Sequence, residues 1–187
     1  SQPDGLANVS RNEQETEAVD ESQTTETENK ITLDASGNAA AGDQSTENKT
    51  AEPSTLDELF GGENLSVTYT GAEIAANYME GGYYSLDAEQ GKTFVIVGID
   101  ITNSGADEIA IDNFAKTPKF SVMVNGQEKA EEENTILPSD FALYQETVPA
   151  GVTENTILLF QVPDSVTSVD SLDLFVNISG TNYQITL

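Results

Sequence analysis

The uneven distribution of aromatic residues is the feature that most constrains what this chain can fold into. All thirteen Phe and Tyr residues lie from Phe60 onward, and Trp is absent. Residues 1–58 also carry 14 acidic and 3 basic residues, among mostly Thr, Ser, Asn, Gln and Ala. Such a segment buries too little apolar surface to offset the entropy lost on ordering. We therefore predict a disordered acidic tether over residues 1–58 and one folded domain over residues 59–187.

The tether also bears on localisation. A flexible chain of this length has a root-mean-square reach of roughly 40 Å, so a spacer is the functional interpretation, and an unstructured leader without a role is the alternative. The sequence starts at Ser1 without an apolar signal segment, as a mature exported protein does. We expect an extracellular protein, anchored to the bacterial cell membrane through a lipidated Cys that would precede Ser1, outside this sequence.

Charge restricts the partners of this chain. Its 33 acidic and 7 basic residues give a formal net charge of −26, which argues against nucleic acid and against direct docking on anionic lipid. The only arginine, Arg11, lies in the tether. The domain therefore lacks the guanidinium fork that suits anionic ligands. We expect a monomer whose partner is an unknown neutral or basic protein or glycan at the cell surface.

The residue types that are missing also limit the chemistry. The absence of His and Cys removes imidazole acid–base catalysis, thiolate chemistry and Cys/His metal sites. Carboxylate pairs remain, but nothing in the spacing of Asp100, Glu146 and Asp173 pairs them across a cleft as a glycosidase requires. We therefore predict no catalytic residues, no enzymatic activity and no cofactor, with calcium as the one ion worth considering.

Alternation of apolar and polar residues dominates the domain and is typical of half-buried antiparallel strands. In residues 92–102, Val95, Val97, Ile99 and Ile101 share one face, and Asn125-Gly126 is a strong hairpin-turn signal. The same alternation recurs in residues 65–69, 120–125, 158–162, 172–178 and 183–187. Short strands with frequent turns predict an all-β fold, an Ig-like antiparallel β-sandwich of seven to nine strands.

Two segments near the start of the domain show patterns that are compatible with a helix. Thr55 and Glu58 have the spacing of a capping box, which predicts one helical turn ending at Gly61-Gly62. Residues 72–80 are ambiguous, because Ile74 and Tyr78 could share a helix face. We prefer a strand or an irregular edge there.

The domain resembles the uncharacterised Ig-like, telokin-like domain of Gram-positive bacterial lipoproteins. Three features carry the resemblance over residues 63–187: a long strand ending in Asn at residues 91–103, the turn at residues 148–151 leading into the strand at 157–163, and a closing hairpin at residues 172–187. The resemblance implies an Ig-like sandwich, export and a lipid anchor ahead of a polar tail. It supplies no catalytic residues.

A tyrosine cluster is the most prominent candidate binding surface. Gly81-Gly82 precedes Tyr83 and Tyr84, with Tyr78 nearby, and an exposed tyrosine can stack on a sugar or anchor a protein contact. In the structural alternative, one tyrosine plugs the end of the sandwich and the other caps the sheet. Met123 and Phe175 also fall on predicted outer faces, either of a covered sheet or of a second core layer.

Acidic loops suggest calcium as a second candidate, because calcium takes oxygen ligands. The candidate metal ligands are Asp164, Asp170 and Asp173, besides acidic clusters at residues 131–134 and 107–112, and none matches a calcium-loop pattern. Our first interpretation is a non-enzymatic extracytoplasmic module with a binding or scaffolding role. The alternative is a calcium- or glycan-dependent accessory domain that uses the acidic loops and Tyr83 and Tyr84.

Overall fold

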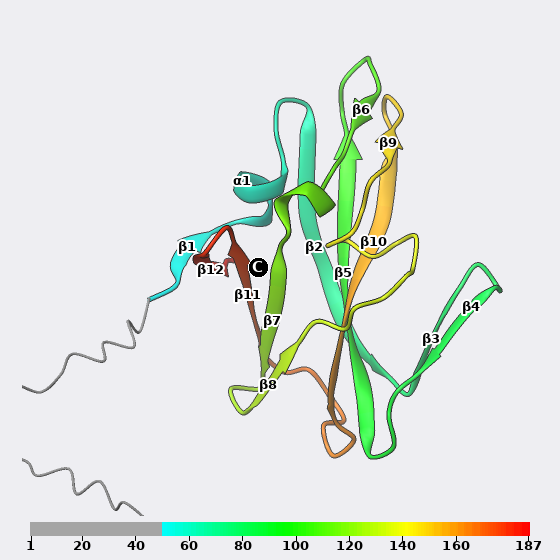
Figure 1. Ribbon diagram of the computed structural model, residues 1–187, viewed down its shortest axis with the longest axis vertical. Helices are drawn as coiled ribbons and strands as arrows, with labels where there is room; N and C mark the ends of the chain where they lie inside the picture. Colours follow the sequence, from blue (N-terminus) through cyan, green and yellow to red (C-terminus); the bar gives the residue numbers. More distant parts are fainter. Residues whose placement is uncertain (1–49) are drawn as a thin grey trace, which may run out of the picture. The chain divides into compact units, whose positions relative to one another are not determined.

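A computed structural model describes residues 50–187 (Figure 1), so residues 1–49 of the predicted tether lie outside the described residues. Two sheets form the body of the domain. The five-stranded sheet has the order β1 (Glu52–Ser54), β12 (Thr181–Ile185), β11 (Leu172–Ile178), β7 (Lys119–Val124) and β8 (Glu128–Glu131). The three-stranded sheet has the order β10 (Thr153–Pro163), β5 (Lys92–Asn103) and β2 (Leu65–Ala75).

Smaller elements complete the domain. A ribbon of β3 (Asn77–Glu80) and β4 (Tyr84–Asp87) and a second ribbon of β6 (Ile109–Ala110) and β9 (Thr147–Val148) flank the two sheets. Helix α1 (Leu56–Phe60) and the 3-10 helix η1 (Phe114–Lys116) are both short. Every strand pair is antiparallel except β1 with β12. The predicted β-sandwich is confirmed, and its two sheets hold eight strands.

The main core lies between the two sheets. The inward side chains of β5, which include Val95, Val97 and Ile99, are fully buried against the inward side chains of β7, β10 and β11. Three aromatic rings fill one part of this core. The Phe60 centroid lies 5.0 Å from that of Phe141 and 5.8 Å from that of Phe120, distances at which ring pairs attract one another. The alternation of apolar and polar residues therefore predicts correctly which side chains of β5 face this core.

A second, smaller core covers the outer face of the three-stranded sheet. Phe94 and Ile96 of β5 pack there with Leu159 of β10 and with Leu137 of the loop at residues 132–141. The β3–β4 ribbon adds Tyr78 and Leu86 at its margin. Because both faces of β5 are covered, its central residues read as a nearly continuous apolar run rather than as a strict alternation.

Regular structure begins earlier than residue 59, the predicted start of the domain. Thr55 Oγ1 accepts the Glu58 N–H and the Glu58 carboxylate accepts the Thr55 N–H, both at 3.1 Å, which confirms the capping box. Leu56 and Phe60 of this helix are buried in the main core, and β1 pairs with β12. The boundary at 58/59 therefore falls inside α1. Residues 52–54 join the sheet through backbone hydrogen bonds, which need no aromatic side chain.

Two local predictions are confirmed. Residues 72–75 form the end of β2 and residues 77–80 the whole of β3, with a bend at Ala76 between them. Asn125 and Gly126 have φ of 53° and 66°, the positive values that a tight hairpin turn requires, and Gln127 N donates to Val124 O at 3.0 Å. The turn joins β7 to β8 and so fixes which side chains of these strands face outward.

Candidate functional site: a groove on the five-stranded sheet

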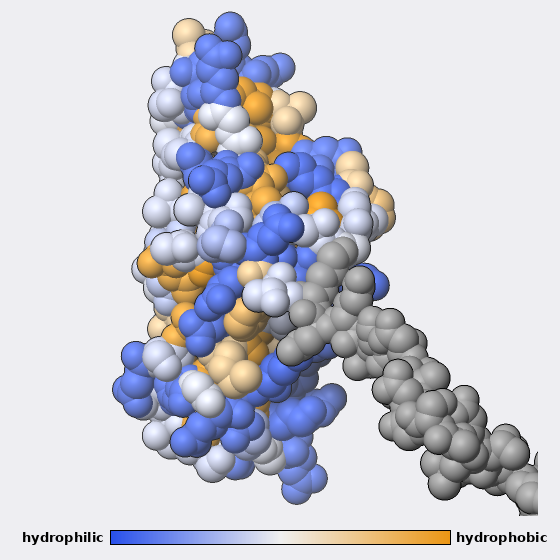
Figure 2. Space-filling view, turned by 90° about the vertical axis from the view of Figure 1, so that its left-hand side faces the viewer, coloured by the Kyte–Doolittle hydropathy of each residue, from blue (hydrophilic) through white to orange (hydrophobic). Residues whose placement is uncertain are grey.

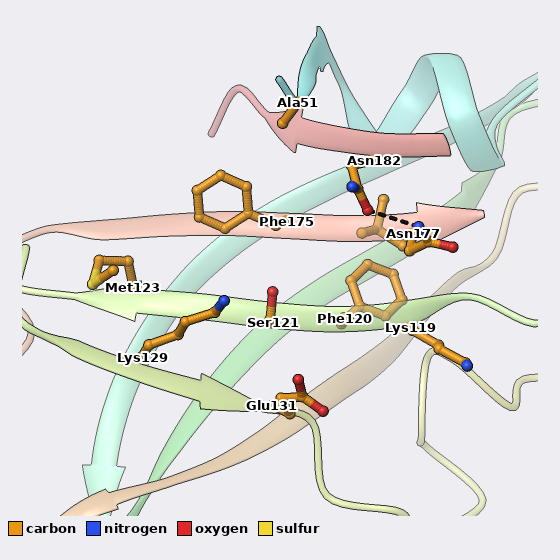
Figure 3. Close-up of a pocket in the computed structure, with 11 residues that line it drawn as sticks. Ala51, Lys119, Phe120, Ser121, Met123, Lys129, Glu131, Phe175, Asn177 and Asn182 are labelled. Carbon is orange, nitrogen blue, oxygen red and sulfur yellow. Dashed lines mark hydrogen bonds between the residues drawn. The ribbon is translucent and has the colours of Figure 1, made fainter. Parts of the chain in front are cut away.

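The outer face of the five-stranded sheet is hollowed into a shallow groove of about 680 Å³ (Figure 3). Alternation along β7 and β11 sends Phe120 and Val176 inward and turns Ser121, Met123 and Phe175 outward. Figure 2 views the side of the molecule that Figure 1 shows at its left, and hydrophobic and hydrophilic residues are interspersed there. The groove therefore combines a partly exposed ring with polar groups.

Strand register fixes the arrangement of the groove. Phe175 of β11 lies beside Ser121 of β7, which lies beside Glu131 of β8. One row along, Met123 lies beside Lys129, and Figure 3 shows the Lys129 side chain extending from β8 toward β7. The remaining lining residues lie toward the other end of the groove or beneath it: Ala51, Lys119, Phe120, Val176, Asn177 and Asn182.

Several polar groups of the groove have hydrogen-bonding capacity to spare. Asn177 Nδ2 donates to Asn182 Oδ1 at 2.7 Å, and Asn177 Oδ1 accepts from Gly180 N at 3.2 Å. Within residues 50–187, the Asn182 amide nitrogen and the Ser121 hydroxyl have no hydrogen-bond partner. Because these groups face solvent, a ligand can take the place of water on them.

The groove also holds an unusual share of the positive charge. Residues 50–187 contain 22 acidic residues but only four lysines, and two of these, Lys119 and Lys129, line the groove. Among the described residues, the one ion pair joins Lys92 to Glu89 and lies elsewhere. Within residues 50–187 the two groove ammonium groups therefore have no carboxylate partner, and their donors can serve a ligand.

Tyr78 lines a second, smaller pocket of about 380 Å³ on the three-stranded sheet, beside an irregularity in β2 between Tyr69 and Gly71. The Tyr78 hydroxyl lies 3.4 Å from Ser139 Oγ, and Ser139 donates from Oγ and N to the Glu80 carboxylate at 2.5 and 3.2 Å. Burial raises the pKa of the Tyr78 hydroxyl. These bonds fasten the β3–β4 ribbon to the loop at residues 132–141, which is a structural role for Tyr78.

The other two predicted tyrosines lie on the same ribbon, which projects from the side of the sandwich in Figure 1. Tyr83 in the turn is 93% exposed, whereas Tyr84 at the start of β4 is 37% exposed. Register places Tyr84 opposite Glu80, so it shares a ribbon face with Tyr78. Of the three tyrosines, Tyr83 is thus the one with a fully accessible ring.

Two carboxyl groups, half-buried Glu132 and buried Asp140, interact beside the end of β8. The pKa of Glu132 is raised from its ordinary value to about 9, first by burial, then by the charge of Asp140 and a hydrogen bond with it. Asp140 is 3% exposed and accepts from Thr135 Oγ1 at 2.5 Å and from Ala142 N at 3.0 Å. Glu132 therefore keeps its proton at neutral pH and can donate it to Asp140. The acidic run at residues 131–134 gave no sign of this pairing.

The three aspartates predicted as calcium ligands do not form a group that could share a metal ion. Asp170 is held by its neighbours, since its N–H donates to Asn125 Oδ1 at 2.7 Å and its carboxylate accepts from Ser168 Oγ at 3.3 Å. Asp173 lies on the outer face of β11, and Asp164 lies in the turn after β10. Within residues 50–187, no three acidic side chains are placed to share a metal ion. Closeness in sequence does not set the direction in which a loop carboxylate points.

Comparisons with known proteins find likenesses among solved structures alone. No family model matches the chain, and no curated protein matches it. An uncharacterised β-sandwich protein of Clostridium difficile is 18% identical, with 66% of this chain and 85% of that chain covered and a TM-score of 0.42. A conserved hypothetical protein of Bacillus anthracis is 11% identical, with 67% and 89% covered and a TM-score of 0.37. A "putative lipoprotein" of Bacillus subtilis is 11% identical, with 66% of this chain and 36% of that chain covered and a TM-score of 0.35.

These neighbours are β-sandwich or uncharacterised proteins of Gram-positive bacteria, and none of them assigns a ligand or a site to this chain. Membership of the telokin-like family remains a prediction. Among the described residues, no helix has the length and apolar character needed to span a bilayer.

Proposed function

We propose that this protein is a non-enzymatic extracytoplasmic binding module whose binding surface is the groove on the five-stranded sheet. The observation that carries the proposal is the outward ring of Phe175 among polar groups that have no hydrogen-bond partner within residues 50–187, notably Ser121 and the Asn182 amide nitrogen. A face that served only to separate the core from water would need no such ring, and exposed aromatics set in a concave surface are typical of recognition sites.

The position of the groove supports this proposal. Its central strands, β7 and β11, each pair with a neighbour on both sides, so the groove floor is a rigid part of the fold. Binding groups on paired strands keep their positions better than groups on loops. A ligand therefore meets side chains whose places are already set, which lowers the entropy lost on binding.

We further propose that the module is displayed from the bacterial cell surface by a lipid anchor ahead of Ser1, with the acidic N-terminal residues as spacer. The acidic, aromatic-free composition of residues 1–49 supports the spacer. Protease treatment of intact cells tests the display. Rapid removal of the domain from intact cells is expected, and protection until the cells are lysed would contradict it.

The binding proposal is tested with the full chain and cell-envelope fractions of a Gram-positive bacterium. Phe175→Ala should reduce retention of the protein on its target fraction, whereas Tyr83→Ala removes a more exposed ring outside the groove and should not. Thermal melting of both variants checks that they fold. Loss of retention in Tyr83→Ala with retention unchanged in Phe175→Ala would move the site to the β3–β4 ribbon.

The ribbon is the one second candidate that an observation favours, because the Tyr83 ring is 93% exposed. In that case the module would make its contact through Tyr83 and Tyr84 at the turn, either with a protein or with a glycan. The same pair of variants decides between the two surfaces.

A further inference from the structure

We propose that the groove binds a neutral polysaccharide chain, an inference that rests on the proposed function and names its ligand class. The groove combines the three kinds of group that recognise sugars in water. Phe175 offers a ring on which the apolar face of a pyranose can stack, while Ser121 and Asn182 offer hydroxyl and amide hydrogen bonds. Sugar hydroxyls both donate and accept, so they match side chains with the same capacity.

The strand pairing disfavours a peptide as the occupant. An extended peptide gains most of its affinity by adding a strand to a sheet edge, where backbone groups are unpaired. The groove lies instead over β7 and β11, whose backbone groups are already used by β8 and β12 and by each other. Recognition on this face must therefore come from side chains alone, as it does for a sugar.

The charges of the face favour a ligand without net charge. Lys119 and Lys129 on this face are balanced by Glu131 and by Asp173, which lies beside Met123. Elsewhere the domain is strongly acidic, with 22 acidic residues against four lysines in residues 50–187. A polyanion is repelled by the body of the domain, and a polycation is drawn to its acidic surface outside the groove. The balanced face is complementary to a neutral polymer.

The dimensions of the face suit a short stretch of such a polymer. From Lys119 to Met123 the strand β7 rises about 13 Å, and the Phe175 ring lies between the two ends of the groove (Figure 3). The ammonium groups of Lys119 and Lys129 can donate to sugar hydroxyls along the groove. Affinity should therefore grow with oligosaccharide length and then level off once the groove is spanned.

The test is affinity electrophoresis of the full chain through gels that contain a soluble glucan, a mannan or a xylan, with polygalacturonate as the charged comparison. At least one neutral polymer should retard the protein. Phe175→Ala should weaken that binding about tenfold or more, Phe175→Tyr should keep it, and Tyr83→Ala should leave it unchanged. Calorimetry at low and high salt should give nearly equal affinities, because no net charge is neutralised.

The outcomes separate this inference from the proposed function. Binding to polygalacturonate alone, or a steep loss of affinity with salt, overturns the neutral ligand. Failure of every polysaccharide, with Phe175-dependent retention of an envelope protein, overturns the glycan and leaves the proposed function in place. Absence of Phe175-dependent binding to any envelope fraction overturns both.

Discussion

The half-buried carboxyl of Glu132, next to the end of β8, interacts with the buried carboxyl of Asp140 in the loop before residue 141. The backbone at both residues also bridges to β10, Glu132 opposite Phe160 and Asp140 opposite Ile157. The loop between them carries Ser139, which holds the β3–β4 ribbon through Glu80. The pair therefore helps to hold the loop at residues 132–141 over the second core. Because the pair can lose a proton, the stability of that loop should depend on pH.

Replacing Glu132 by Gln should flatten the dependence of stability on pH. The pKa of Glu132 is raised from 4.5 to about 9 in the folded chain. Its contribution to the free energy of unfolding is therefore fully present below pH 4.5 and is lost as the pH rises toward 9. At pH 7 the carboxyl is ionised in the unfolded chain but protonated in the folded one. This difference lowers the free energy of unfolding by about 3 kcal/mol. The amide is neutral at every pH and can still donate to Asp140.

Denaturant unfolding at pH 5, 7 and 8.5 measures this effect. Glu132→Gln should gain stability over the native sequence as the pH rises, while Glu131→Gln, the exposed neighbouring residue, should follow the native profile. Parallel profiles for Glu132→Gln and the native chain would show that the carboxyl does not retain its proton.

Replacing Asn103 by Ala should destabilise the fold by about 2–4 kcal/mol, because buried polar groups would lose their partners. The Asn103 side chain is fully buried, donates from Nδ2 to Asp107 O and Val148 O at 2.8 and 3.0 Å, and accepts from Gly105 N at 2.9 Å. Chemical denaturation compares it with Asn155→Ala, an exposed amide, which should cost much less. Equal losses in the two variants would contradict the role of Asn103.

Truncation tests where the folded domain begins. Removal of residues 1–49 should leave the melting temperature nearly unchanged, whereas removal of residues 1–60 also deletes β1, Leu56 and Phe60. Loss of a buried Phe alone typically costs about 3–5 kcal/mol, so the shorter chain should melt much lower or fail to fold. Phe60→Ala in the full chain provides the matched single change. A domain that starts at residue 61 and melts like the full chain would restore the boundary first predicted.

Millimolar calcium should not raise the melting temperature. A ligand that binds only the folded state must stabilise it, and among residues 50–187 no three acidic side chains are placed to share an ion. Differential scanning fluorimetry with calcium, and with magnesium as the comparison, measures this. A calcium-specific rise, abolished by Asp170→Asn, would restore a site at the predicted loop.

The strands and turns of this protein could be predicted because their signals are local. Alternation oriented Phe175 and Met123 outward, and the Asn125-Gly126 pair identified its turn. Whether such outward residues were covered could not be decided from the same pattern, since the cover comes from segments distant in sequence. On the three-stranded sheet the loop at residues 132–141 supplies it, whereas no segment of residues 50–187 fills the groove on the five-stranded sheet.

By itself the sequence determined the all-β class, the capping box that begins α1, and the removal of His- and Cys-based chemistry, because these follow from residue types and their spacing along the chain. Only the tertiary structure decided that Glu132 meets Asp140, that two of the domain's four lysines share a groove with Phe175, and that the predicted aspartates stay apart. Those relationships depend on which strands become neighbours. Long-range pairing, and the burial that follows from it, sets the distances between side chains that the linear order leaves open.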